Sequence, residues 1–248
     1  MDLSIILYED EHLLVINKPS GIVVNRAQSV KGETVQDFAD AYLHLASREA
    51  SAPQKSTEPL TKEIKEIFLD RSGVAHRTDK ETSGCLLIAK APVVLGLLLE
   101  KFREHAIKKT YLAIVHGKIV PSEGEINAPV GRLPWNTERF GIVAGGKESV
   151  TKYKVEKFFE QKNSQFSLVE CYPKTGRTHQ IRVHLKYINH PIVGDYLYAG
   201  RKTARDDRKW APRVMLHAWK LSFDHPILMK RLEIEAPVPD DMMKIACI

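Results

Sequence analysis

Two strand-like segments joined by a short polar turn set the strongest limit on the fold of this chain. Residues 150–159 and 165–172 are rich in β-branched and aromatic side chains, and the turn Gln161-Lys162-Asn163-Ser164 lies between them. A connection of hairpin length joins antiparallel neighbours. Further short strands recur along the chain, outnumber the helices and show no internal repeat. The sequence therefore predicts an α+β fold with a largely antiparallel sheet.

Hydrophobic periodicity predicts the remaining elements. Helices are expected from about residue 33, with Thr34 as N-cap, and over residues 61–69, 92–105 and 178–188, the last capped by Thr178. Other strands are expected over residues 5–8, 13–17, 85–89, 110–117 and 215–223, and a surface loop over residues 47–59.

The composition is typical of a globular protein of a reducing compartment. No apolar run approaches the roughly 20 residues that cross a bilayer, and the first residues lack the basic segment of a signal peptide. Cys85, Cys171 and Cys247 are odd in number and lack CxxC spacing, which favours buried thiols over disulfides, with an exposed position open for Cys247 near the terminus. We therefore expect a cytoplasmic protein without a membrane partner.

Positive charge is concentrated in the C-terminal part of the chain. Residues 1–150 carry 19 Lys and Arg against 20 Asp and Glu, whereas residues 151–248 carry 18 against 11. A one-sided basic surface is typical of proteins that bind a polyanion such as nucleic acid. The same excess also occurs in proteins that only need solubility. The basic run over residues 201–213 is therefore expected either to contact nucleic-acid phosphates, through Arg201, Lys202, Arg205, Arg208, Lys209 and Arg213, or to be a solvated loop.

One carboxylate, Asp79, stands out by its surroundings. It lies among basic residues in His76-Arg77-Thr78-Asp79-Lys80-Glu81-Thr82-Ser83-Gly84, directly before the apolar strand over residues 85–89. A carboxylate acts as a nucleophile only when it is ionised and oriented, which nearby cations favour. From the residues alone, Asp79 can equally be a turn or capping residue.

Basic residues also gather where the helix over residues 178–188 is expected to begin. Arg182 falls in its first turn, where the helix dipole disfavours a cation and invites an anion. That anion can be a carboxylate such as Asp79 or a phosphate, and Arg177 and His179 crowd the same anion-attracting helix end. The alternative is that Arg182 is simply an exposed arginine.

Tyr111 has two interpretations. It lies in the strand over residues 110–117, whose even and odd positions are both mostly apolar, so both faces are expected to be buried. A tyrosine in such a strand is usually part of the core. Alternatively, its ring can stack on a base that is flipped into a pocket.

Metal and serine-hydrolase chemistry receive little support from the sequence. The ten histidines show no HExxH spacing and no accompanying CxxC pair, so no metal site is predicted. The chain also lacks the GxSxG motif of a nucleophile elbow.

Three ordered blocks closely resemble the RluA family of RNA pseudouridine synthases. They are the segment from His76 to Gly84, Lys109-x-Tyr111-x-Ala113-x-Val115-x-Gly117, and the segment from Gly176 to His184 that contains Arg177, Thr178, His179, Gln180 and Arg182. The similarity extends over about residues 5–226 through four further matches: residues 14–21, 190–195, 216–218 and Phe223-x-His225-Pro226. The resemblance implies a mixed, mainly antiparallel sheet with flanking helices and a central catalytic cleft. It also implies a single catalytic domain over residues 1–248, without a separate N-terminal RNA-binding domain.

By this resemblance, Asp79 is the nucleophile, Tyr111 lies against the target base and Arg182 pairs with Asp79. Arg77 is the arginine that enters the RNA stack when the uridine flips out, and Arg177 and His179 are expected to contact RNA. The implied reaction is the isomerisation of uridine to pseudouridine in tRNA or rRNA. We expect a monomer that needs no cofactor.

One departure and two alternatives accompany the resemblance. Thr78 stands where the family usually has leucine, so the packing beneath Asp79 can differ. A non-catalytic RNA-binding protein could share the fold, but it would not need Asp79, Tyr111 and Arg182 together. A hydrolase acting through Asp79 would need a second carboxylate at a fixed separation.

Overall fold

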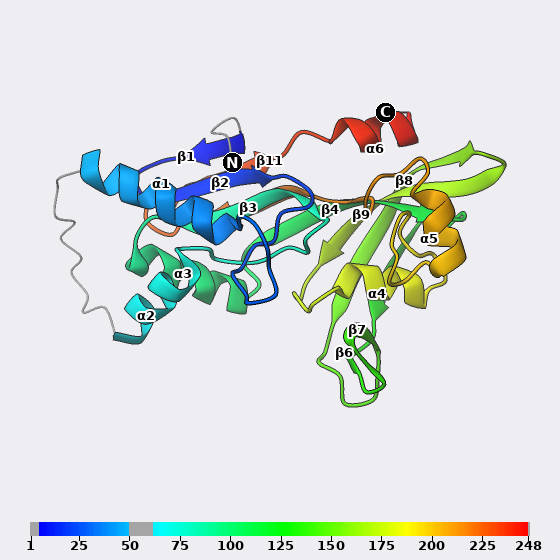
Figure 1. Cartoon of the computed structure of the whole chain (residues 1–248), viewed down its shortest axis with the longest axis horizontal. Coiled ribbons are helices and arrows are strands. Elements are labelled where there is room, and N and C mark those ends of the chain that lie inside the picture. The colour runs from blue at the N-terminus through cyan, green and yellow to red at the C-terminus, as the bar shows by residue number, and fades with distance from the viewer. Residues whose placement is uncertain (1–4, 50–61, 248) are drawn as a thin grey trace. The chain divides into compact units, whose positions relative to one another are not determined.

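The computed structural model describes residues 5–49 and 62–247 and divides the chain into two compact units. The first unit comprises residues 1–107 and 221–236, and the second comprises residues 108–220 and 237–248. Strand β10 (Leu216–Asp224) contributes residues to both units. Helices and antiparallel strands occur in each unit (Figure 1), which confirms the predicted α+β class. The single-domain expectation stays a prediction.

The first unit is built around a short antiparallel sheet. Its strands β1 (Ile6–Glu9), β2 (Leu13–Lys18) and β3 (Ser83–Ala89) pair in that order, with Leu13 opposite Ala89 and Lys18 opposite Gly84. All seven residues of β3 are buried, as the apolar run over residues 85–89 predicts. Strand β11 (Arg231–Glu235) pairs with β10.

Three helices complete the first unit: α1 (Val35–Glu49), α2 (Lys62–Arg71) and α3 (Pro92–Arg103). The predicted cap of α1 is confirmed, because the backbone N–H of Asp37 donates to Thr34 Oγ1 over 3.2 Å. The Asp37 carboxylate in turn accepts the Thr34 N–H over 2.8 Å, a reciprocal capping pair. The prediction of a loop over residues 47–59 is wrong for residues 47–49, which belong to α1. The remaining residues of that predicted loop lie outside the described part of the chain.

The second unit contains four long or medium strands in the order β4 (Lys108–His116), β9 (Ser164–Pro173), β8 (Val150–Gln161) and β5 (Glu123–Asn127), all antiparallel. The hairpin predicted between residues 150 and 172 is confirmed. Its two turn residues, Lys162 and Asn163, have φ values of 51° and 57°. Positive φ at both positions matches the right-handed twist of the flanking strands.

A separate hairpin of β6 (Val130–Leu133) and β7 (Asn136–Ile142) extends away from these strands beside α4 (Gln180–Tyr187), as Figure 1 shows. The second unit also holds α5 (Arg201–Asp207) and α6 (Asp240–Ala246). None of the helices in the described residues is long and apolar enough to span a membrane.

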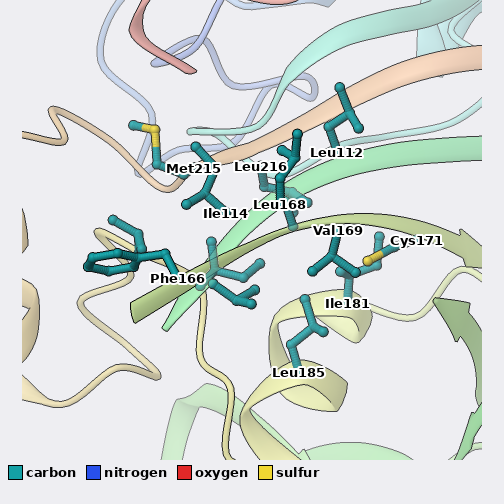
Figure 2. Packing of buried hydrophobic residues seen from close by; sticks show 14 of the residues in the cluster. Leu112, Ile114, Phe166, Leu168, Val169, Cys171, Ile181, Leu185, Met215 and Leu216 are labelled. Carbon is teal, nitrogen blue, oxygen red and sulfur yellow. The ribbon is translucent and has the colours of Figure 1, made fainter. Parts of the chain in front are cut away.

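The core of the second unit lies between β4, β9 and helix α4. Figure 2 shows Ile181 and Leu185 on the helix face that meets Val169 and Cys171 of β9. Burial of that stripe is what the spacing of Ile181, Leu185 and Ile188 predicts, and Ile188 is partly buried beside the cluster. Packing of this apolar face fixes which side of α4 points away from the core.

The start of α4 differs from the sequence prediction. The N-cap residue is His179 rather than Thr178, and it makes no side-chain capping bond. His179 has a φ of 56°, a left-handed conformation that non-glycine residues rarely adopt. The next residue explains this conformation, because the buried side chain of Gln180 fixes the loop that precedes the helix.

Candidate active site

Asp79 opens a tight turn that leads into β3. The N–H of Thr82 donates to the Asp79 carbonyl over 3.1 Å, and Thr82 and Ser83 are buried. Gly84 has a φ of 105°, so the chain needs glycine at the point where the turn becomes a strand. The Asp79 side chain is partly buried, whereas that of Arg77 is exposed.

The turn that carries Asp79 is held by residues near the N-terminus. Lys18 is fully buried, and its Nζ donates to the carbonyls of Pro19, Ile22 and Lys80 at 3.0, 3.0 and 3.2 Å. The N–H of Gly21 also donates to the Lys80 carbonyl, over 2.8 Å. Three carbonyls around one ammonium satisfy a charge that burial would otherwise penalise.

A second clamp acts on the same turn, because Ser20 Oγ donates to the carbonyl of Glu81 over 2.8 Å. The backbone around Asp79 is therefore fixed by the segment Lys18-Pro19-Ser20-Gly21. The sequence had identified this segment as part of the family resemblance. Its structural role follows from the hydrogen bonds.

Thr78, the residue that departs from the family motif, is 7% exposed. Its Oγ1 is buried without a hydrogen-bond partner among the described residues. A buried hydroxyl without a hydrogen-bond partner has a desolvation cost that no bond compensates. The departure therefore has a structural consequence next to Asp79.

His76 is structural in the first unit. Its Nε2 accepts the backbone N–H of Leu87 over 3.1 Å, and its ring lies 5.0 Å from that of Phe102. Since Nε2 accepts, the neutral ring carries its proton on Nδ1. His76 thus joins the segment before Asp79 to β3 and α3.

Tyr111 lies in β4 opposite Cys171 of β9. The prediction that this strand is buried on both faces is confirmed for Leu112 to Val115, but Tyr111 itself is only partly buried. Lys109 is two residues earlier and therefore points to the same face of the strand. Burial lowers the pKa of the Lys109 ammonium to about 8.

Arg182 forms a buried ion pair with Asp195. Nε of Arg182 lies 2.7 Å from Oδ2 and Nη2 lies 2.9 Å from Oδ1 of the carboxylate, which is the two-pronged geometry that arginine favours. Oδ1 also accepts the N–H groups of Leu197 and Tyr198 at 3.0 and 3.2 Å. Arg182 is 6% exposed and Asp195 is fully buried.

Asp195 is a partner of Arg182 that sequence reasoning missed. The acid was visible in the match over residues 190–195, but the sequence alone could not show that the loop after α4 returns to Arg182. The pairing of Arg182 with Asp79 stays a prediction, and two of the guanidinium nitrogens bind Asp195.

A continuous hydrogen-bond chain orders the loop before α4. Gln180 Oε1 accepts the Arg177 N–H over 3.0 Å, and Gln180 Nε2 donates to Thr151 Oγ1 over 3.0 Å. The Thr151 hydroxyl lies 2.9 Å from His184 Nδ1, and His184 Nε2 lies 3.0 Å from the Ala128 carbonyl. A carbonyl only accepts, so His184 carries its proton on Nε2 and Thr151 donates to Nδ1. Burial lowers the pKa of His184, which suits this neutral form.

Arg177, His179 and Arg182 come together around the start of α4. Arg177 is exposed, and its Nε donates to the Glu148 carbonyl over 3.2 Å. His179 Nδ1 lies 2.9 Å from the hydroxyl of Tyr198, whose ring also faces the Arg182 guanidinium at 5.0 Å. His179 and Arg182 thus share a contact with Tyr198, and the grouping of Arg177 with them as one RNA-binding cluster stays a prediction.

The basic run over residues 201–213 separates into two kinds of residue. Arg213 is buried and binds Asp241 through two nitrogens, and Arg208 donates to the carbonyls of Gly194 and Pro212. These two arginines therefore stabilise the fold. The exposed cations on α5 are Arg201, Lys202 and Arg205.

Comparison with known proteins places these features in a family. The profile of a family described as RNA pseudouridylate synthase matches residues 12–187. A Bacillus subtilis protein named uncharacterized RNA pseudouridine synthase YlyB is 37% identical over 245 residues, covering 99% of this chain and 72% of that protein. Ribosomal large subunit pseudouridine synthase D of Nitrosomonas europaea is 38% identical over 242 residues, covering 96% of this chain but only 62% of that protein.

Two solved human structures share the fold. RNA Pseudouridylate Synthase Domain Containing 4 aligns with a TM-score of 0.69 at 26% identity, covering 96% of this chain and 90% of that one. RNA Pseudouridylate Synthase Domain Containing 1 aligns with a TM-score of 0.67 at 27% identity, covering 94% and 82%.

Proposed function

Because this chain belongs to the RNA pseudouridylate synthase family, whose members are isomerases, we propose that it converts specific uridines of tRNA or rRNA to pseudouridine. The observation that carries the proposal is the match over residues 12–187, which includes Asp79, Tyr111 and Arg182. rRNA is the first substrate to test, because several relatives are named as ribosomal large subunit synthases. The enzyme is proposed to act as a cytoplasmic monomer.

The reaction exchanges one bond of the nucleoside for another. The bond between N1 and C1′ breaks, the uracil rotates, and C5 forms a new bond to C1′. C5 loses its proton and N1 gains one, so the product is an isomer of the substrate. No oxidant, reductant or external cofactor is required by this balance.

Asp79 is proposed as the nucleophile of this reaction. Attack on the ribose, attack on the base and elimination through a glycal are all compatible with one aspartate in that role. The clamped turn supports the proposal, since a nucleophile must be held in one geometry. Tyr111 is proposed to lie against the target base, and Arg182 to favour the ionised, oriented form of Asp79.

RNA binding is proposed to use the start of α4 and the exposed face of α5. Arg177 and His179 lie where backbone N–H groups and the helix dipole favour anions. Arg201, Lys202 and Arg205 add three exposed positive charges in the same unit. Arg77, exposed two residues before Asp79, is proposed to replace the flipped uridine in the stack.

Replacing Asp79 tests the catalytic proposal. Asp79→Asn should abolish pseudouridine formation in total RNA while RNA affinity stays within about tenfold, because loss of a nucleophile typically costs on the order of 10⁶ in rate. Asp224→Asn is the matched control, since Asp224 is an exposed acid in a surface ion pair with Arg231. Residual turnover of a few per cent in Asp79→Asn would defeat the assignment. Full RNA binding without activity in the unmodified protein would instead favour a non-catalytic RNA-binding protein on this fold.

Charge reversal tests the proposed phosphate-binding residues. In Arg201→Glu with Arg205→Glu, the slope of log affinity against log salt should fall in magnitude by somewhat under one unit for each phosphate that the protein no longer neutralises. Lys62→Glu is a suitable control, because Lys62 is an exposed lysine of the first unit. An unchanged slope would mean that α5 faces solvent and does not contact RNA phosphates, and that the start of α4 is the phosphate site. Mapping pseudouridine in cellular RNA with and without the gene would identify the modified uridine.

A further inference from the structure

The β6–β7 hairpin carries an unusually exposed tryptophan at its tip. Pro134 and Trp135 are the two residues that connect the strands, and Trp135 is 80% exposed. That is the largest exposed fraction among the large apolar side chains of the described residues. A lone exposed apolar residue needs no explanation by itself, so its surroundings decide its meaning.

The root of this hairpin is fastened to the start of α4. The N–H of Phe140 donates to the Tyr198 hydroxyl over 3.1 Å, and the Phe140 ring packs edge-on against His179 at 5.6 Å. Arg139 donates to the Leu197 carbonyl, and Val130 joins the buried cluster of Val183 and Tyr198. The tip therefore keeps a defined position relative to the proposed phosphate site of the same unit.

Cations line the hairpin and its root. The Arg132 guanidinium lies 5.1 Å from the centre of the Phe140 ring, which holds an exposed positive charge along the hairpin. Exposed Lys147 and Arg177 follow at the root, with Glu138 and Glu148 as the nearby exposed acids in sequence. Proteins that bind single-stranded nucleic acid combine such cations with aromatic rings on which bases stack.

We propose that Trp135 is a stacking platform for an unpaired base of the RNA substrate. The proposal rests on the proposed function and specifies its substrate as RNA with a single-stranded segment that reaches the hairpin. The Trp135 side chain is 80% exposed, and the exposed residues Arg132 and Arg177 supply positive charge for the flanking phosphates. A protein partner would call for a contiguous apolar patch, whereas the chain neighbours of Trp135 at the tip are Pro134 and polar Asn136.

Binding of a fluorescently labelled, unstructured 12-nucleotide RNA of mixed sequence tests the platform. Trp135→Ala should raise the Kd by about 5- to 150-fold, which corresponds to the roughly 1–3 kcal/mol that one base–aromatic stack contributes. Trp135→Phe keeps an aromatic ring and should stay within about threefold of the unmodified protein. The salt slope should be unchanged in Trp135→Ala, because every phosphate-binding cation is kept, but reduced in Arg177→Ala.

Tryptophan fluorescence provides a readout that does not depend on activity. RNA should quench the unmodified protein more strongly than Trp135→Phe, since stacking on a base quenches the indole at position 135 directly. Equal quenching, an unchanged Kd in Trp135→Ala, or a Kd in Trp135→Phe as weak as in Trp135→Ala would each overturn the proposal. A reduced salt slope in Trp135→Ala would also overturn it, because the effect would then be electrostatic.

The two proposals fail in different ways. If the unmodified protein forms pseudouridine but Trp135→Ala binds RNA normally, the stacking platform is wrong and the enzymatic function stands. If the unmodified protein forms no pseudouridine and RNA still quenches Trp135 with the expected pattern, the enzymatic function is wrong and the platform stands.

Discussion

Removing the carboxylate of Asp195 should strongly destabilise the second unit. Asp195→Ala removes the carboxylate that binds two nitrogens of the buried Arg182 guanidinium, and it removes the acceptor of two backbone N–H groups. Truncating one member of a buried ion pair typically costs about 3–5 kcal/mol. Each backbone hydrogen bond that is removed adds about 0.5–1.5 kcal/mol. Because these effects are not fully additive, we expect the free energy of unfolding to fall by about 4–6 kcal/mol.

The isosteric variant separates shape from charge. Asp195→Asn keeps an oxygen that can accept the N–H groups of Leu197 and Tyr198, but its amide nitrogen would face a donor nitrogen of Arg182. We expect a loss of about 2–4 kcal/mol. Asp224→Asn, in an exposed pair with Arg231, should cost at most about 1 kcal/mol.

Urea unfolding followed by fluorescence measures these differences, and a double-mutant cycle identifies their origin. Arg182→Leu in the Asp195→Ala background removes the buried charge that has lost its bidentate partner, and it should recover at least about 2 kcal/mol relative to the sum of the single changes. Additive behaviour, or a loss below about 1 kcal/mol in Asp195→Ala, would refute the view that this pair holds the loop to α4.

Three further changes test individual interactions. Thr78→Val should raise the free energy of unfolding by about 1 kcal/mol, because it replaces a buried hydroxyl that has no hydrogen-bond partner among the described residues. Thr78→Ser keeps the hydroxyl and should not raise it. A lower melting temperature in Thr78→Val would contradict this. Gly194→Ala should lose at least about 2 kcal/mol, since a Cβ at φ +76° would lie 2.2 Å from the Arg213 carbonyl oxygen; a neutral effect in urea unfolding would show that the loop adjusts. Burial lowers the pKa of His184 below its ordinary 6.5, so the unfolded chain binds a proton that the folded protein excludes. Stability should therefore fall as the pH drops below about 6.5, by up to about 1.4 kcal/mol for each pH unit, and the same slope in His184→Gln would argue against this origin.

Local sequence patterns predicted most elements of the fold because their causes are local. The turn at Lys162 and Asn163, the apolar run of β3 and the cap at Thr34 each depend on residues close in the chain. Beyond residue 223, however, β11 and α6 were not anticipated. They are short, and packing against distant segments determines them more than their own periodicity.

The interactions that organise the candidate site could not be predicted in the same way. Asp79, Arg182 and the cluster at the start of α4 were identified from their types and order. Their partners come from remote positions: Lys18 reaches the carbonyl of a residue 62 positions later, and Gln180 reaches Thr151 of another strand. His179 was expected inside the helix, but a left-handed residue at its start depends on that remote network rather than on local propensity.

Because Lys18 is buried, chemical labelling of its amine can measure how often the segment around Asp79 opens. Acylating reagents attack free amines in contact with solvent, and the Lys18 amine is enclosed by three carbonyls with none of its surface exposed. Acylation of Lys18 therefore requires the Asp79 turn to open, whereas the 92% exposed side chain of Lys62 reacts at the intrinsic rate. The ratio of the two labelling rates, read from peptide masses, converts directly into the opening free energy of the segment that presents Asp79.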